Sequence, residues 1–353
     1  MAPWCLSCCF GLLLASLIAG CVISPRRLPG DVAPGATPTP TPGTATGKLY
    51  VSNQAANSIL RFDGASTASA NVAPGATIAG GATQLSSPQY LFVDQAADRL
   101  FVANTGGSSV LIFDAVSTMT GNNNTAPTRS IFGAATTLNS PSDLALDKGR
   151  DMLYVADNLN ILVFNAASSS TTTGNVPVAR NLSVGFSISA IFLDAANDRL
   201  FLSDAVGSAV HVYDNVSTLT SGAVAANRTI MGVGTQLASP VGLQVDGAGR
   251  LIVSNNAVAA TGITMYSNAA TASGNATPVA AISGSNTGFG SPSQIALDAT
   301  GSGTLYITDP GTAKIPIYSS LSSTNGNLTP TRNINGAATT LGQNTGIALD
   351  TTH

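Results

Sequence analysis

From residue 48 onward, apolar residues gather in short runs, each bounded by Asp, Asn, Gly or Ser. The runs are rich in β-branched and aromatic side chains, as in KLYVS, YLFVD and ILRF. Such runs are typical of β-strands, and no segment here shows a convincing helical period. The pattern therefore predicts an all-β domain.

Four kinds of run recur in a fixed order, about every 50 residues. The first kind ends in an aspartate in all six copies: Asp94, Asp147, Asp194, Asp246, Asp298 and Asp350. The second kind ends in Asn or Asp, as in RLFVAN and MLYVAD, and the third ends in an aromatic residue, as in VLIF. The fourth has an Ile near a Gly, as in RSIFG; the unit at 152–198 is shorter and has RNLSVG in its place.

Four short strands repeated six times indicate a six-bladed β-propeller of four-stranded antiparallel blades. The chain opens the repeat with a second-kind strand, KLYV, and ends it with a first-kind strand, GIALD. The two sets are complete only if the C-terminal strand joins the N-terminal blade. The sequence thus predicts one ring-closed domain over 48–353.

The motif P-x-G-[IL]-x-[VL]-D, then [RK]-L-[YF]-V-[AS]-[DN], then I-x-[VI]-[FY], resembles NHL-type repeats. That resemblance implies the six-bladed ring. Its relatives include gluconolactonase-like hydrolases, which hold a central divalent metal with Glu, Asn and Asp, and lyases that use a His and Glu pair. This chain has no glutamate, and its one internal histidine, His211, occupies an ordinary strand position.

The N-terminus has a different pattern. The apolar run at 10–19 is too short to span a bilayer and is typical of a secretory signal. The tetrad IAGC at 18–21 resembles the lipobox of bacterial lipoproteins, which implies a signal peptide over 1–20 and lipidation with palmitate-type chains at Cys21. Residues 21–47 are rich in Pro, Thr and Gly and predict an extended linker. The resemblance therefore implies a lipid anchor that holds the protein in the cell envelope. In a Gram-negative host it implies the outer membrane, because lipoproteins kept in the inner membrane have Asp after the cysteine and this chain has Val22.

Charge is sparse. Only 9% of residues are charged and the net charge is −3, with no run of like charges, so we expect no nucleic-acid partner. No phosphate loop, nucleophile elbow or thiol site accompanies the repeats. Together these features favour a non-catalytic role.

One candidate site follows from the repeat. The last residues of the six second-kind strands should share one face of the ring, and their oxygens suit calcium. These residues are Asn53, Asn104, Asp157, Asp204, Asn255 and Asp309. Capping of the adjacent turns is the alternative role, and it is favoured because only three of the six are charged.

Three further sets of residues recur. The third-strand aromatics should pack between blades, with a ligand-stacking ring as the alternative: Phe62, Phe113, Phe164, Tyr213, Tyr266 and Tyr318. Four arginines that open the fourth strand should mark an exposed, charged edge: Arg129, Arg180, Arg228 and Arg332. The long polar loops between the third and fourth strands should form a soluble fringe on one face, which a protein or glycan could also use.

The expected function is a monomeric, envelope-anchored, non-catalytic binding or scaffold module for a protein or glycan partner. No cofactor is expected. The alternative is a calcium-dependent hydrolase of the lactonase kind, with a central Asp/Asn site.

Overall fold

The computed structural model describes residues 46–257, 262–301 and 303–353. The predicted signal peptide (1–20), the predicted lipidation site Cys21 and the predicted linker up to residue 45 lie outside these residues. The described residues form strands β1 to β26, joined by turns and single-turn 3-10 helices. No helix within them is both long and apolar enough to cross a bilayer.

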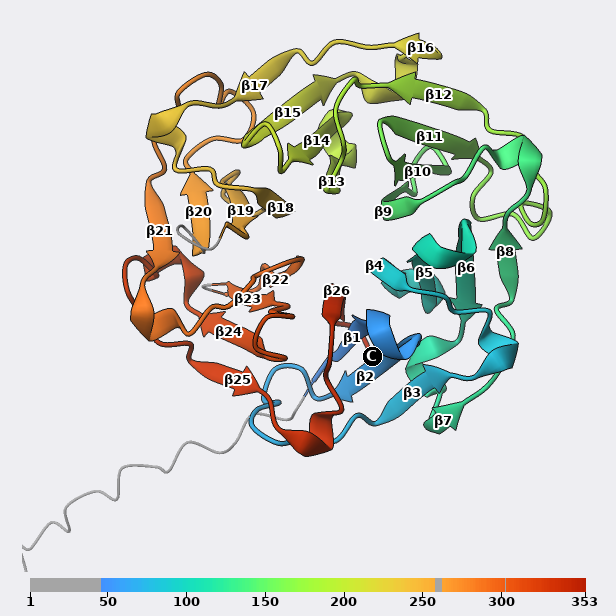
Figure 1. Cartoon of the computed structure of the whole chain (residues 1–353), viewed down its shortest axis with the longest axis horizontal. Helices are drawn as coiled ribbons and strands as arrows, with labels where there is room; N and C mark the ends of the chain where they lie inside the picture. Colours follow the sequence, from blue (N-terminus) through green and yellow to red (C-terminus); the bar gives the residue numbers. More distant parts are fainter. Residues whose placement is uncertain (1–45, 258–261, 302) are drawn as a thin grey trace, which may run out of the picture. The chain divides into compact units, whose positions relative to one another are not determined.

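The strands form six blades around a central axis, as predicted (Figure 1). Each blade has four antiparallel strands, placed side by side in order from the axis to the outer edge. Blade 1 holds β26 (Asn344–Asp350), β1 (Lys48–Asn53), β2 (Ser58–Asp63) and β3 (Ala76–Ala79). Blade 2 holds β4 (Pro88–Asp94), β5 (Arg99–Asn104), β6 (Ser109–Asp114) and β8 (Arg129–Ile131). Blade 3 holds β9 (Pro141–Asp147), β10 (Met152–Asp157), β11 (Asn160–Asn165) and β12 (Arg180–Ser183).

Blades 4 to 6 repeat the arrangement. Blade 4 holds β13 (Ala190–Asp194), β14 (Arg199–Asp204), β15 (Ala209–Asp214) and β17 (Arg228–Ile230). Blade 5 holds β18 (Pro240–Val245), β19 (Leu251–Asn255), β20 (Gly262–Tyr266) and β21 (Ala280–Ser283). Blade 6 holds β22 (Ile295–Asp298), β23 (Thr304–Ile307), β24 (Ile315–Ser319) and β25 (Arg332–Ile334).

The ring closes as the sequence predicts. The C-terminal strand β26 pairs antiparallel with β1, with Lys48 opposite Asp350 and Val51 opposite Ile347. The first and last strands of the chain therefore share one blade, which ties the two ends of the ring together.

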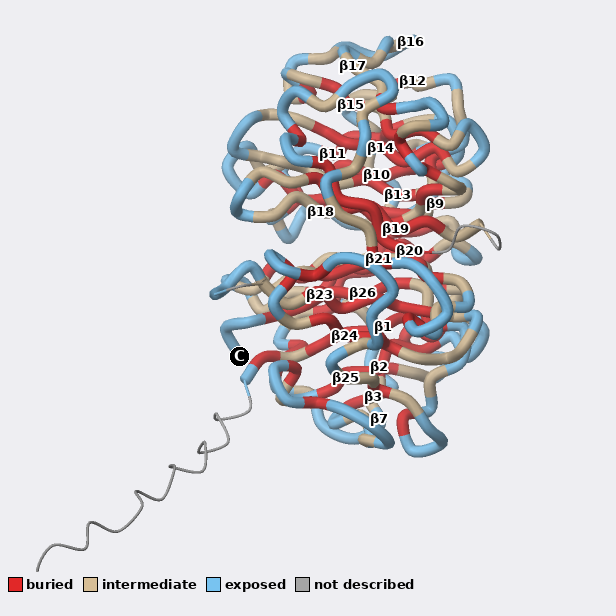
Figure 2. Tube along the Cα trace, turned by 90° about the vertical axis from the view of Figure 1, so that its left-hand side faces the viewer, coloured by how far each residue is buried: buried red, intermediate tan, exposed pale blue. Residues whose placement is uncertain are grey.

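The hydrophobic core is divided among the six junctions between neighbouring blades, and the buried residues lie along the strands (Figure 2). Each junction contains one of the recurrent third-strand aromatics: Phe62, Phe113, Phe164, Tyr213, Tyr266 and Tyr318. All six are at most 2% exposed, so their packing role is confirmed.

The loops between the third and fourth strands are not a free fringe, which corrects that expectation. Each loop crosses to the preceding blade and pairs in parallel with that blade's outermost strand. Two of the pairings are the short strands β7 (Gly121–Asn123) on β3 and β16 (Gly222–Ala223) on β12. The other four are single bridges: Ala70 to Ile334, Ile131 to Gly174, Ile230 to Gly274 and Ile282 to Gly326. Together the loops form an outer belt that covers the exposed edge of every blade.

The four arginines that open the fourth strand are not at a free edge either. Arg129 is only 5% exposed, and its Nη1 donates to the carbonyl oxygens of Ala167 and Ser169 in the next blade. In the same way, Arg180 donates to backbone carbonyls of blade 4 and Arg332 donates to backbone carbonyls of blade 1. Arg228 instead pairs with Asp214 of its own blade. The expected edge residues are therefore mostly clamps between blades.

Candidate functional site

The six Asn and Asp residues at the ends of the second strands are all buried, with exposures between 0% and 8%. Five of the six accept hydrogen bonds through a side-chain oxygen. The donors are backbone N–H groups of the adjacent turn or of the loop that enters the same blade. Asp157 accepts hydrogen bonds from the backbone N–H groups of Asn139 and Ser140, and Asp309 accepts from those of Gly290 and Ser291.

The remaining four make similar local bonds. Asn104 and Asn255 accept from backbone N–H groups of the loops before their blades, Asp204 accepts from Gly207 N, and Asn53 donates to Thr340 O. These contacts favour the capping role, because the oxygens of five of the six residues already have donors; Asn53 Oδ1 is buried without one. Calcium binding by this set stays a prediction.

Charge is distributed unevenly between the two ends of the strands. Second-to-third-strand turns and fourth-to-first-strand loops meet on one side, which we call the neutral face. Its segments in the described chain are 54–57, 80–87, 105–108, 132–140, 158–159, 184–189, 205–208, 231–239, 256–257, 284–294, 308–314 and 335–343. Their charged residues are Asp309, which is fully buried, and Lys314.

The opposite end of the strands, which we call the charged face, holds nearly all the ion pairs. Examples are Lys148 with Asp94 at 2.6 Å and Arg199 with Asp214 at 2.6 Å. Within the described residues, the one exception is the 3.7 Å contact of His211 with Asp204.

Exposed apolar side chains are concentrated on the neutral face of blades 2 to 4. Val233 is 98% exposed and Val206 is 89% exposed. Phe132, Met231 and Leu159 are each about half exposed. Burial of such side chains against a partner would be favourable, and this face carries little charge to desolvate.

His211 occupies a strand position in β15, as the sequence suggested. Its ring stacks on Phe186 at 4.1 Å and its Nδ1 lies 3.1 Å from Thr229 Oγ1. Burial lowers the pKa of His211, although the Asp204 carboxylate acts in the opposite direction. The imidazole is therefore neutral at physiological pH, which suits packing.

A cavity of about 210 Å³ is lined by residues from all six blades. Most of these residues belong to the innermost strands β4, β9, β13, β18, β22 and β26, which surround the ring axis in Figure 1. Most of the lining residues are apolar, including Phe92, Ile191 and Phe192, although polar atoms make up more than half of the surface that faces the cavity. Its lining runs from Asp143 and Gln294, near the start of their strands, to Gln95, Leu297 and Leu349 at the other end.

Asp143 is the one ionisable group in the cavity lining and is 1% exposed. Its Oδ1 accepts from Leu144 N at 2.8 Å and its Oδ2 from Ile191 N at 2.8 Å. Gln294, from the opposite side of the axis, donates from Nε2 to Asp143 Oδ1 at 3.4 Å. Burial raises the pKa of Asp143 to about 8, against the opposing effect of the two backbone bonds.

The residues that close the axis were missed by the sequence reasoning. Tyr90, Asp143 and Gln294 occupy the third position of the P-x-G motif, where two other blades have Gly242 and Gly346. Tyr90 reaches Ser293 of blade 6, with 3.2 Å between the hydroxyl oxygens. Departure from glycine at one repeat position was the available signal, because a large side chain there must enter the axis.

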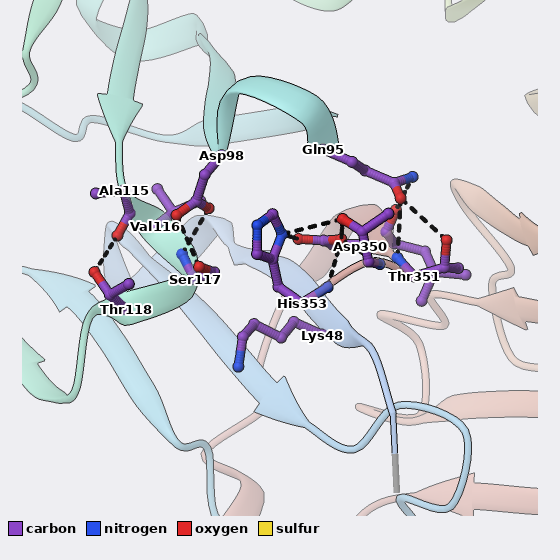
Figure 3. Close-up of polar contacts among 12 residues, drawn as sticks. Lys48, Gln95, Asp98, Ala115, Val116, Ser117, Thr118, Asp350, Thr351 and His353 are labelled. Atoms are coloured by element: carbon purple, nitrogen blue, oxygen red, sulfur yellow. Dashed lines mark hydrogen bonds and ion pairs between the residues drawn. The ribbon is translucent and has the colours of Figure 1, made fainter.

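A second polar cluster lies where the ring closes (Figure 3). Ligand atoms of Asp98, Asp350 and His353 all lie within 4.8 Å of one another, and no other such group of acidic, His or Cys side chains occurs in the described residues. His353 Nδ1 lies 2.7 Å from Asp350 Oδ2, and Gln95 Oε1 accepts from Thr351 N at 3.1 Å. The cluster holds the C-terminal segment against blades 1 and 2.

Asp350 at the centre of that cluster is fully buried. Burial by itself would raise the pKa of this carboxyl, but hydrogen bonds from Thr352 and His353 outweigh it and lower the pKa below its usual value. The carboxylate is thus engaged in closing the ring.

Comparison with known proteins supports the fold. No family model matches the sequence, and no curated protein is significantly similar. Solved structures do match. A protein of unknown function from Desulfotomaculum acetoxidans superposes with a TM-score of 0.53 at 12% identity, covering 82% of this chain and 80% of that one.

Two further structures are similar to a comparable degree. A chain of a nidogen/laminin complex matches with a TM-score of 0.57 at 14% identity, covering 86% of this chain and 98% of that one. Hydrazine synthase of Kuenenia stuttgartiensis matches with a TM-score of 0.52 at 15% identity, covering 76% of this chain and 72% of that one. At these identities the likeness shows a shared β-propeller architecture.

Proposed function

We propose that this chain is a cell-envelope lipoprotein of NHL-type repeats whose propeller is a non-catalytic binding or scaffold module. It docks its partner on the neutral face. A protein partner is the first choice, because five large apolar side chains are exposed there on consecutive blades. The Ser, Thr and Asn residues between them also suit a glycan.

The contrast between the two faces is the observation that carries the proposal. A charge buried at an interface without a partner costs free energy. In the described neutral-face segments Lys314 is the only charged residue that is not already buried, so this face accepts a neutral surface at low cost. Val206 and Val233 are almost fully exposed, which leaves them free to contact a partner.

A pull-down from envelope extract with the full mature protein tests this role. We expect Val206→Asp/Val233→Asp to lose the captured partner, because two carboxylates would be buried in the contact. Val279→Asp is the control, since Val279 is an exposed apolar side chain that precedes β21 at the charged end of that strand. Equal capture by the double variant and by Val279→Asp contradicts docking on the neutral face.

The anchor is tested separately. The proposal places acyl chains on Cys21, so labelled palmitate should be incorporated into the wild-type chain and not into Cys21→Ser. The variant should also leave the membrane fraction. Membrane retention and labelling of Cys21→Ser would exclude the lipoprotein assignment while leaving the docking test unaffected.

A further inference from the structure

The lining of the axial cavity combines one carboxyl group with many apolar side chains, and this combination suits a particular kind of ligand. We propose that it binds a small primary ammonium compound with an apolar tail, whose charged head lies against Asp143. This inference is independent of docking on the neutral face.

The carboxyl group supplies the first part of the argument. Asp143 is buried, and its hydrogen-bond donors are two backbone N–H groups and the Gln294 amide. No Lys, Arg or His of the described chain is paired with it. A buried carboxylate needs a positive partner, and the chain itself does not provide one.

The neighbouring side chains provide a comparison. Gln244 Nε2 donates to Ile295 O, and Gln294 Oε1 accepts from Ile347 N, so each caps the free inner edge of the next blade. Asp143 caps the next inner strand in the same way, at Ile191 N. It is the one member of this group with an ionisable side chain, so capping alone does not account for a carboxyl group in the cavity.

The head group also finds further acceptors. An ammonium group has three N–H donors. Asp143 Oδ2 accepts one protein hydrogen bond, from Ile191 N, and Gln294 Oε1 accepts one, from Ile347 N. Both oxygens therefore keep a lone pair for a ligand at the same end of the cavity.

The wall argues for an organic cation over a metal ion. Calcium takes six to eight oxygen ligands. The side chains of the lining offer one carboxylate and three Gln amides, and the others are aliphatic or aromatic, including Leu91, Phe92 and Phe192. An apolar tail gains free energy by lying against such side chains. The ligand should therefore carry one charged end and one apolar end.

The volume sets the size of the tail. An engineered protein cavity of about 150 Å³ lined by Leu, Ile and Phe binds benzene. The axial cavity, at about 210 Å³, offers room for a ring plus an aminomethyl group. Benzylamine, protonated at neutral pH, is therefore a suitable probe.

Isothermal titration of the full-length protein in detergent, in a buffer without primary amines, tests the proposal. We expect benzylammonium to bind at least tenfold more tightly than benzyl alcohol and benzoate not to bind. Asp143→Asn should reduce benzylammonium affinity to that of benzyl alcohol and leave benzyl alcohol unchanged. Equal affinities in the wild type, absence of benzylammonium binding, or an unaltered preference in Asp143→Asn would each overturn the proposal.

A measurement on the wild type covers the case in which the variant does not fold. Intermolecular NOEs from the benzyl ring to Phe92 and Phe192 are expected, because both line the cavity. NOEs confined to surface residues would place the ligand elsewhere and reject the axial site.

Discussion

Asn124, in a loop of blade 2, accepts a hydrogen bond at 2.9 Å from the backbone N–H of Ala82 in blade 1. The bond fixes the outer belt to the 3-10 helix η2 (Gly81–Thr83) of the preceding blade. Equivalent bonds join Asn175 to Ala135, Asn275 to Gly234, Asn327 to Asn286 and Asn71 to Ala338. Five of the six junctions therefore share this hydrogen bond between a loop Asn and a 3-10 helix of the preceding blade, which we call the Asn lock.

The sixth junction lacks both halves of the lock. The short unit of blade 3 has no 3-10 helix between β12 and β13, and the following loop has Ala223 at the Asn position. In the complete junctions a positive-φ glycine precedes the helix and lies close to the Asn side chain, as Gly80 does beside Asn124. Asn and helix are present or absent together, which indicates that the Asn serves the junction.

The lock can be tested by removal. Asn275→Ala deletes the acceptor for Gly234 N and should lower the free energy of unfolding by about 1 kcal/mol, as for loss of a helix cap. Ala223→Asn is the control, and it should leave stability unchanged because blade 3 offers no helix. Urea denaturation measures both. Equal effects of the two substitutions would show that the Asn acts only on its own loop.

The arginine clamps predict a larger effect. Arg129→Ala should cost about 3 kcal/mol, because a buried charged donor is lost and the carbonyls of Ala167 and Ser169 lose their partner. Arg228 holds the same repeat position but forms a partly exposed pair with Asp214. Arg228→Ala should therefore cost about 1 kcal/mol or less. The same urea titration compares them, and similar losses would contradict a role in clamping blades.

Close packing at the axis gives a third prediction. A Cβ atom on Gly346 would lie 2.2 Å from the carbonyl oxygen of Gln89. We expect Gly346→Ala to lower stability by about 3 kcal/mol, because two inner strands must separate. Gly247 is the control, since a Cβ there meets no atom within 4 Å. If Gly346→Ala melts at the same temperature as Gly247→Ala, the inner strands are not packed this tightly.

The ring and its closure were accessible from the sequence because they depend on local patterns. KLYV and GIALD are each a strand by composition, and six copies of each leave one way to pair them. The aromatic residue of the third strand was likewise interpretable, because one large residue per blade must pack between sheets.

Contacts between neighbouring blades were not accessible in the same way. Arg129 appears at the start of an edge strand, and its sequence neighbours do not indicate that Ala167 comes within reach. Asn124 lies in a polar loop whose path around the preceding blade has no local signal. Asp143 depends on the geometry of the axis, where six strands converge and single repeat positions face one another.

The histidine should give a measurable pH effect. Burial lowers the pKa of His211 in the folded protein, so the unfolded chain binds its proton more readily. The stability that this group contributes is thus present above pH 6.5 and is lost as pH falls below that value. His211→Leu introduces the residue that blades 1 to 3 have at this position, and this variant should lack the loss. Melting temperatures from pH 7.5 to 5 compare the two proteins, and parallel curves would mean that the imidazole titrates normally.

The axial carboxyl should show the opposite dependence. The pKa of Asp143 is raised to about 8 in the folded protein, whereas an unfolded aspartate titrates near 3.9. Between these values the folded state holds the proton and the unfolded state does not, so stability attributable to Asp143 falls as pH rises from about 4 to 8. Wild type should therefore lose stability relative to Asp143→Asn across this window. A direct measurement is the ¹³C shift of the Asp143 carboxyl, assigned by comparison with the variant. Its midpoint should lie near pH 8 in amine-free buffer; a midpoint near 4 would show that the axis is hydrated enough to hold the charge without a partner.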